Sequence, residues 1–297
     1  MTSDHAPTIP PEGLLARIGR STLGIVSYLG GMGVLAASAA RSLAWPRGEA
    51  PPLGGAVVRQ WVWLFGAGLP LVAMIHAALG AFLAMQAYYG ATFAEAAGPV
   101  VGVGLYRNLA PLMVGFIMAG LMAARLTPEL RRPSHLGLDD DPRWLPDREV
   151  RAGRRPDPRT PTEPARLVGV RLAAAALAGP ILVVLGGTIG TLVGLLVARK
   201  MTALPPAIFL AKFFEMFWTR DVIGLVGKGA AFGLVSALFA CHEGLRGTPA
   251  DGPDAVPWAA SRAACLATAT ILFINSAWFL LFYHAGPAFG PTVLTPP

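Results

Sequence analysis

Long uncharged runs dominate the pattern of this chain. Five of them contain no Asp, Glu, Lys or Arg, and they cover residues 62–86, 96–106, 108–124, 172–198 and 263–283. A helix needs about 20 apolar residues to cross the hydrocarbon core of a bilayer. A transmembrane barrel would instead need alternating strands of about 10 residues, and these runs do not alternate. The pattern predicts an all-α polytopic membrane protein with five transmembrane helices, over 59–87, 96–125, 172–198, 221–241 and 258–284.

The N-terminal part of the chain differs from these five spans. Residues 1–11 are rich in proline and polar residues, which predicts a disordered N-terminus without a cleaved signal peptide. A helix is expected over 12–44, and its uncharged centre is flanked by Arg20 on one side and Arg41 on the other. A spanning helix normally carries its bases at one end only. We therefore expect an amphipathic helix that lies in the cytoplasmic interface, with a further span as the open alternative.

The polar segments indicate how the spans are oriented. Residues 126–171 are dense in Arg, Asp and Pro, a composition that cannot form a buried core and predicts an irregular cytoplasmic loop. Bases such as Arg59 precede the first span, so the N-terminus is expected in the cytoplasm and the C-terminus in the periplasm of a bacterial inner membrane. A short apolar helix is expected at 207–218. Four bases fit this topology poorly because they fall on the outer side: Arg199, Lys200, Lys212 and Arg220.

Composition and motifs narrow the function. Only 14% of the residues are charged, against about 25% in a soluble domain. The formal charge of +7 comes mostly from arginines in loops, which is typical of cytoplasmic membrane flanks, so no nucleic-acid partner is expected. No GxxxxGK[ST], HExxH or GxSxG motif occurs, and Cys241 and Cys265 form no CxxC pair. We expect a non-enzymatic membrane protein without a metal or cofactor of its own.

Two basic residues lie inside the predicted spans, Arg107 and Lys228. A charge at the bilayer centre costs about 3 kcal/mol on insertion scales, so such residues usually face a cavity or a partner. Arg107 is far from either end of its span, whereas Lys228 could also extend its side chain towards an interface. Asp221 shares a helical face with Lys228, but the two residues are two turns apart and too distant to touch.

Small residues also form a pattern in the third span. Gly186, Gly190 and Gly194 are spaced four apart and therefore lie on one face of a helix. This spacing lets two helix backbones approach closely. The face is expected either to pack inside one subunit or to form a subunit interface.

Four segments together resemble one known family. They begin with RQWVWLFGAGLPLVAMIHAALGAFLAMQAYYGA and GLYRNLAPLMVGFIMAGLMAARLTPEL, and continue with PARLVGVRLAAAALAGPILVVLGGTIGTLVGLLVA and FWTRDVIGLVGKGAAFGLVSALFACHEGLRG. They resemble the MlaE/YrbE permeases, the membrane subunits of ABC-type lipid transporters that work with MCE proteins. The last segment is the most specific, because Asp221, Lys228, Phe232 and residues 241–246 stay in register with the family pattern.

The resemblance implies a fold, partners and site residues. It implies an interfacial helix followed by five spans, a homodimer or heterodimer of permeases, a cytoplasmic ATPase that binds the ATP, and a periplasmic MCE-domain protein. It also implies a lipid-sized cavity in the dimer. The residues expected to line the lipid path are Arg107, Asn108, Gln86, Tyr88 and Tyr106. Those expected to couple to the ATPase are Arg125 and Glu129.

The chain departs from the family pattern in two places. The family has a glutamate where this chain has Asn108, so Arg107 is expected to lack its carboxylate partner and to favour an anionic head group. The segment EQIDAL, which engages the ATPase in the family, is absent after Leu130. The alternative function is therefore a transport-inactive paralogue, which acts as a scaffold in a larger membrane complex and uses residues 131–165 as a docking surface.

Overall fold

The computed structural model describes residues 14–44, 53–90, 97–136, 164–246 and 254–284, and within them all regular structure is helical. The helices are α1 (Leu14–Ala44), α2 (Leu53–Gly90), α3 (Ala110–Leu136), α5 (Pro164–Thr202), α6 (Pro206–Met216), α7 (Thr219–Leu245) and α8 (Ala255–Phe279). Three short π-helical segments adjoin them, η2 (Gly98–Val103), η3 (Leu105–Leu109) and η6 (Leu280–His284). The prediction of an all-α polytopic membrane protein is confirmed.

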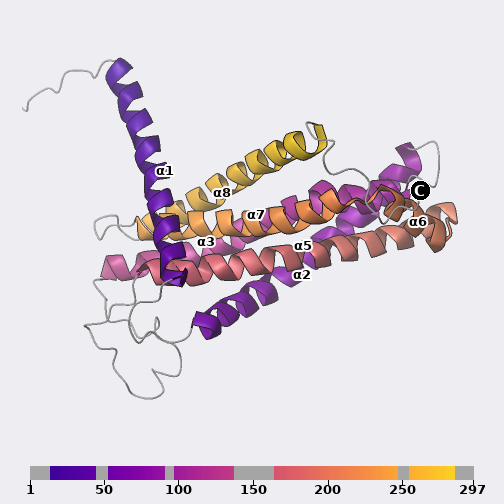
Figure 1. The fold of residues 1–297 in the computed structure, drawn as a ribbon, viewed down its shortest axis with the longest axis horizontal. Coiled ribbons are helices and arrows are strands. Elements are labelled where there is room, and N and C mark those ends of the chain that lie inside the picture. Colours follow the sequence, from indigo (N-terminus) through magenta and orange to yellow (C-terminus); the bar gives the residue numbers. More distant parts are fainter. Residues whose placement is uncertain (1–13, 45–52, 91–96, 137–163, 247–253, 285–297) are drawn as a thin grey trace, which may run out of the picture.

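Six helical stretches of the described part are long and apolar enough to cross a membrane, namely the five predicted spans and α1. Figure 1 shows α2, α3, α5 and α7 running along the long axis of the molecule, whereas α1 runs steeply across one end of this bundle. Only 11% of the apolar window of α1 is buried, against 50% for the windows in Pro99–Arg131 and Thr219–Leu245 and 17% for the window in Ala255–Phe282. Length and composition therefore allow α1 to span, while its transverse course is the one expected of an interfacial helix.

Two hydrogen bonds join α1 to the end of the bundle where α5 begins and α7 ends. Ser42 Oγ donates a hydrogen bond to the carbonyl of Ala165 on α5 (3.2 Å). The Tyr28 hydroxyl donates to Oε1 of Glu243 on α7 (2.7 Å). Both contacts attach α1 to the end of the bundle where α3 ends and α5 begins.

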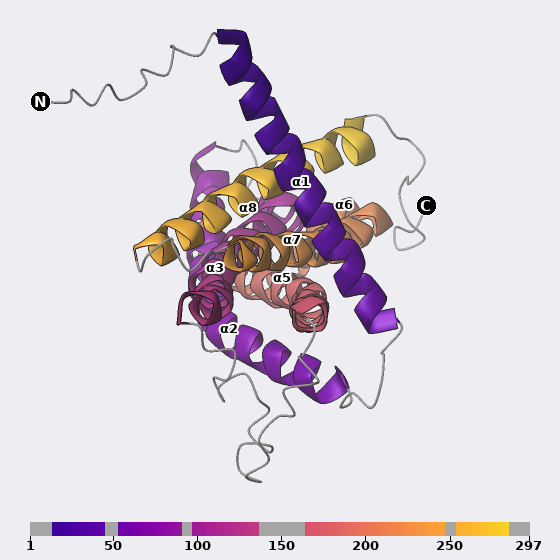
Figure 2. The same ribbon diagram turned by 90° about the vertical axis from the view of Figure 1, so that its left-hand side faces the viewer.

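Close backbone approach holds the centre of the bundle together. Figure 2 shows α7 near the middle, with α3 and α5 beside it. Gly179 of α5 and Gly229 of α7 face each other so closely that a Cβ atom on either would meet the backbone of the other helix. Around this crossing, Met118, Leu126 and Leu182 are fully buried. Glycine is required here because any side chain would force the two helices apart.

The helix boundaries differ from the predicted ones at the polar loop. Helix α3 continues to Leu136 and α5 begins at Pro164, so residues 126–136 and 164–171 are helical where an irregular loop was predicted. The reason is that the polar side chains of these turns pair with each other: Glu129 accepts from Arg125 (2.6 Å) and from Arg171 (3.2 Å). The rest of the predicted loop, 137–163, and the N-terminal residues 1–11 lie outside the described residues.

Candidate functional site

The centre of the candidate site is the π-helical segment that precedes α3. The Ala110 N–H donates to the carbonyl of Leu105, five residues earlier, which is the wide turn of a π-helix. Pro111 follows and has no N–H, so the carbonyl of Arg107, four residues before it, has no α-helical donor. The Lys228 Nζ donates to this carbonyl (2.8 Å). The side chain of Lys228 is used inside the bundle, and the alternative that it extends to an interface is wrong, since the residue is only 1% exposed.

The guanidinium of Arg107 forms a two-pronged ion pair with Asp221 at the start of α7. Its Nε lies 2.7 Å from Oδ1 and its Nη2 lies 3.0 Å from Oδ2. The same Nη2 donates to the carbonyl of Met216 at the end of α6 (2.8 Å). The Asp221 side chain is fully buried, whereas that of Arg107 is 22% exposed. The prediction that Arg107 lacks a carboxylate partner is therefore wrong, because the partner comes from another helix, 114 residues along the chain.

Asp221 also organises the beginning of α7. Its Oδ2 accepts the backbone N–H of Trp218 (2.8 Å), and its own N–H donates to the Trp218 carbonyl (2.9 Å). A carboxylate in the first turn of a helix is stabilised by the unpaired N–H groups and by the helix dipole. Arg107, Asp221 and Lys228 form a unit that we call the charge cluster, with two cations and one anion.

The neighbours of Arg107 connect the same segment to further helices. Asn275 of α8 donates from Nδ2 to Oδ1 of Asn108 (2.6 Å). The hydroxyls of Tyr106 and Thr188, on α5, are 2.8 Å apart, and the Tyr106 ring packs against Phe213 of α6 with centroids 5.9 Å apart. Three consecutive residues thus bind η3 to α5, α6, α7 and α8. These contacts oppose a change in the relative position of the four helices.

Other predicted site residues lie elsewhere. Gln86 and Tyr88 are exposed on the last turns of α2, where the Tyr88 ring packs against Tyr89 (4.9 Å between centroids). The coupling candidates Arg125 and Glu129 lie near the other end of α3, where Arg125 stacks on the ring of Trp63 at 3.9 Å. Of the residues expected to line the lipid path or to couple to the ATPase, the structure therefore brings Tyr106, Arg107 and Asn108 into one region and places the others outside it.

The three glycines of α5 pack within the chain. A Cβ on Gly186 would meet the His76 ring at 2.9 Å, and one on Gly190 would meet the His76 carbonyl oxygen at 2.8 Å. Gly194 faces the carbonyl oxygen of Gly80 (3.0 Å) and the side chain of Val101. This face is occupied by α2 and η2, which favours internal packing over the alternative of a subunit interface.

Sequence reasoning missed a second buried charge, Glu243 near the end of α7. Its side chain is fully buried. Its Oε2 accepts from Arg262 Nε on α8 (2.8 Å), and its Oε1 accepts from Tyr28 on α1 (2.7 Å). The signal was available, since a carboxylate at the end of an apolar run needs a partner for the same reason as Arg107. No group of three or more His, Cys, Asp or Glu side chains that could hold a metal ion occurs among the described residues.

The fold and the buried ion pairs define a multi-pass membrane protein whose helices are joined by paired charges. The family model of the permease MlaE matches residues 57–131 and 162–281, which is more than half of the chain. The chain therefore belongs to the MlaE permease family. The unmatched stretch between the two blocks contains the part where the sequence departs from the family pattern.

Named relatives support the same assignment at a coarser level. A probable ABC transporter permease protein of Rickettsia conorii is 26% identical over 231 residues, covering 76% of this chain and 82% of that protein. One from Rickettsia prowazekii is 29% identical over 199 residues, covering 65% and 71%. One from Synechocystis is 30% identical over 163 residues, covering 54% and 55%. The chain is a multi-pass membrane subunit of the ABC permease type.

Proposed function

We propose that this chain is the permease subunit of an ABC-type lipid transporter that works with a separate ATPase and an MCE-domain protein. The observation that carries the proposal is the linkage through Tyr106, Arg107 and Asn108, which joins η3 to four helices by side-chain contacts. Hydrogen bonds and ion pairs have discrete alternatives, so such a linkage is suited to a two-state opening of the bundle. The phosphate of a lipid head group is the substrate chemistry that matches an arginine at 22% side-chain exposure.

The two ends of α3 connect the lipid path to the ATPase in this proposal. Helix α3 has 27 residues and is therefore about 40 Å long. The charge cluster adjoins its first turn, and the Arg125–Glu129–Arg171 ion pairs tie its later turns to α5. A displacement of these later turns by an ATPase would be transmitted along the helix to η3. The ATP itself is bound by the partner subunit, and the permease acts as a homodimer or heterodimer.

Affinity purification in mild detergent, with mass spectrometry of the bound proteins and lipids, tests the proposal. We expect an ABC ATPase, an MCE-domain protein and phospholipid to co-purify. Recovery with an unrelated membrane complex, without an ATPase or lipid, would overturn the proposal and support the scaffold alternative. ATP-dependent transfer of a fluorescent phospholipid between the purified assembly and acceptor vesicles then measures transport directly.

Two variants separate a substrate role of Arg107 from a structural one. Both Arg107→Gln and Asp221→Asn break the ion pair, but only Arg107→Gln removes the cation that would meet a lipid phosphate. We expect the lipid retained per folded protein to fall in Arg107→Gln and to be preserved in Asp221→Asn. An equal loss in both variants would show that the arginine acts only through the structure of the bundle.

A further inference from the structure

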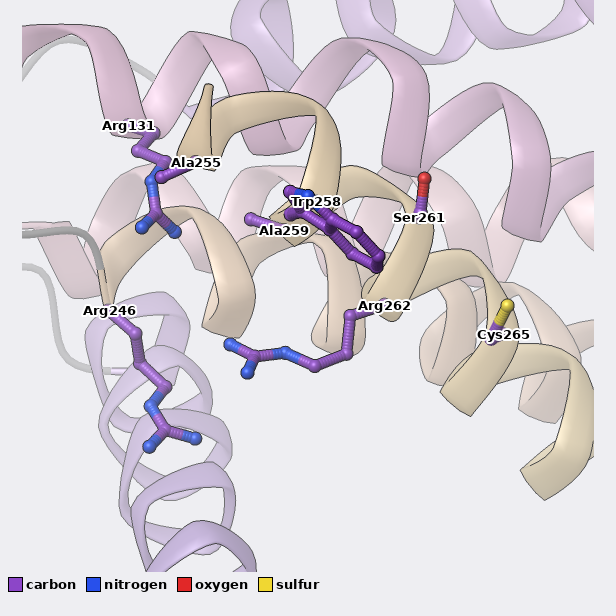
Figure 3. Close-up of a pocket in the computed structure, with 8 residues that line it drawn as sticks. All are labelled: Arg131, Arg246, Ala255, Trp258, Ala259, Ser261, Arg262 and Cys265. Atoms are coloured by element: carbon purple, nitrogen blue, oxygen red, sulfur yellow. The ribbon is translucent and has the colours of Figure 1, made fainter. Parts of the chain in front are cut away.

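A pocket of about 680 Å³ lies at the end of the bundle remote from the charge cluster. It is formed where α3 and α7 end and α8 begins (Figure 3). The lining residues are Arg131, Arg246, Ala255, Trp258, Ala259, Ser261, Arg262 and Cys265. We call it the arginine pocket, because each of the three helices or its immediate C-cap contributes one arginine. None of the residues expected to line the lipid path or to couple to the ATPase lines it.

The charge of the arginine pocket favours an anion. The described residues that line it include three arginines and no carboxylate. The buried Glu243 carboxylate lies behind the pocket and accepts from Arg262 through both Nε (2.8 Å) and Nη2, and from the Tyr28 hydroxyl (2.7 Å). Arg131 Nη1 donates to the carbonyl of the same residue (3.3 Å). Figure 3 shows the three guanidinium groups at one end of the pocket and Cys265 at the other. Guanidinium groups are matched in shape and charge to phosphate oxygens, which they can bind through two parallel N–H groups.

The side chains that continue from the pocket along α8 favour a membrane lipid as the source of the anion. Trp258, Ser261, Arg262 and Cys265 are spaced by three and four residues, so they lie on one face of α8. Trp258 is 78% exposed, at the helix end where tryptophan commonly anchors a membrane protein in the interface. The same face continues beyond Cys265 with the exposed side chains of Leu272 and Leu280. The arginines therefore lie at the end of an apolar stripe that runs along α8.

We propose that the arginine pocket binds the phosphate-bearing head group of an anionic phospholipid whose acyl chains lie along α8. The phosphate is held by arginines from three helix ends, and the chains cover the exposed apolar stripe. A soluble phosphate or an acidic side chain of a protein partner would use the arginines and leave the stripe uncovered. The inference does not depend on transport, because this lipid is held at the opposite end of α3 from Arg107. It acts as a bound lipid that ties α3, α7 and α8 together.

Lipid retention in nanodiscs tests the proposal on the full chain. The protein is reconstituted in phosphatidylcholine with or without phosphatidylglycerol, released into mild detergent, and the retained lipids are counted by native mass spectrometry. We expect phosphatidylglycerol to be retained in preference to phosphatidylcholine. Arg246→Gln removes one exposed guanidinium and is expected to lower this retention about tenfold, the loss of one charge-assisted contact. The matched control is Arg41→Gln, an exposed arginine in the last turn of α1, which is expected to retain the lipid.

Cysteine alkylation gives a second measurement, which uses the native cysteines of the chain. Cys241 is buried and Cys265 is exposed in the pocket, so N-ethylmaleimide should react at Cys265 alone. Phosphatidylglycerol is expected to slow this reaction in the unmodified chain, and the slowing should be lost in Arg246→Gln.

Four results would overturn the lipid assignment. One is equal retention of the two lipids, and another is an equal loss in Arg41→Gln, which indicates diffuse attraction to the surface. The third is protection of Cys265 by inorganic phosphate alone in phosphatidylcholine discs, which assigns the pocket to free phosphate. The last is release of a co-purified protein by Arg246→Gln with lipid retention unchanged, which assigns it to a protein contact.

Discussion

Removing the negative charge of Asp221 tests the charge cluster most directly. Asp221→Asn keeps the size of the side chain and its acceptor for the Trp218 N–H, and removes the charge that balances Arg107 and Lys228. Breaking a buried ion pair by removing one partner costs about 3–5 kcal/mol. The Arg107 side chain is 22% exposed and can be partly solvated, so the lower value applies. We expect a loss of about 3 kcal/mol in the free energy of unfolding, roughly a hundredfold in the equilibrium constant.

The loss can be measured by titrating the purified protein in mild detergent with a denaturing detergent and following helicity or tryptophan fluorescence. A double-mutant cycle with Arg107→Gln isolates the pairwise term. The control is the exposed pair of Lys212 and Glu215, whose side chains are 41% and 59% exposed. Glu215→Gln should change stability by less than about 1 kcal/mol, as is usual for surface ion pairs.

Two results would refute the reasoning about the charge cluster. One is a loss in Asp221→Asn no larger than that in Glu215→Gln. The other is strict additivity of Arg107→Gln and Asp221→Asn, because residues that form one ion pair should show a coupling energy. Either result would mean that the two charges are solvated independently.

Three further predictions test other parts of the bundle by the same unfolding titration. Gly229→Leu places a side chain against the backbone of α5, so it should prevent folding or lower the free energy of unfolding by more than about 3 kcal/mol. Gly66→Ala is the control, because a Cβ there meets open space and should cost little. Equal effects of the two substitutions would contradict the packing. Asn108→Ala and Asn275→Ala should each lower the free energy of unfolding by about 1–2 kcal/mol, and their effects should be non-additive because they remove the two partners of one hydrogen bond. Additive losses would show that the two residues have separate roles. Glu243→Gln removes a fully buried negative charge that accepts hydrogen bonds from Tyr28 and Arg262, and it should lower the free energy of unfolding by about 2 kcal/mol. An unchanged midpoint of the unfolding titration would show that Tyr28 and Arg262 are solvated without this charge.

The structure changes the partners that the family resemblance implied for Arg107 and Asn108. The chain has Asn108 where the family pattern has a glutamate, which leaves no carboxylate next to Arg107 in the sequence. In the structure the carboxylate is supplied by Asp221, and Asn108 instead binds Asn275 through a neutral hydrogen bond. Arg107 is therefore balanced by Asp221, and the positive charge that remains in the charge cluster is that of Lys228.

Much of the architecture was predictable from local pattern. Uncharged runs of about 20 residues are stable in the bilayer, so the approximate limits of the five predicted spans follow from hydropathy. Hydropathy does not decide whether α1 spans, because its apolar stretch is also long enough to cross a membrane. The limits near the polar loop were less accurate, because the stability of residues 126–136 as helix depends on pairing between Glu129 and Arg171, which lie 42 residues apart. The spacing of Gly186 and Gly190 predicted close packing, but the sequence left open which helix would occupy that face.

The sequence by itself determined that the chain is a bundle of membrane-length helices and that Arg107 and Lys228 need partners, because an uncompensated charge in hydrocarbon is costly whatever the fold. It also contained the reason for the Lys228 contact, since Pro111 removes the helical donor of the Arg107 carbonyl. Only the tertiary structure decided that Asp221 is the carboxylate and that three arginines line one pocket. These contacts join residues far apart in the chain, and their distances depend on how whole helices cross, which no local spacing specifies.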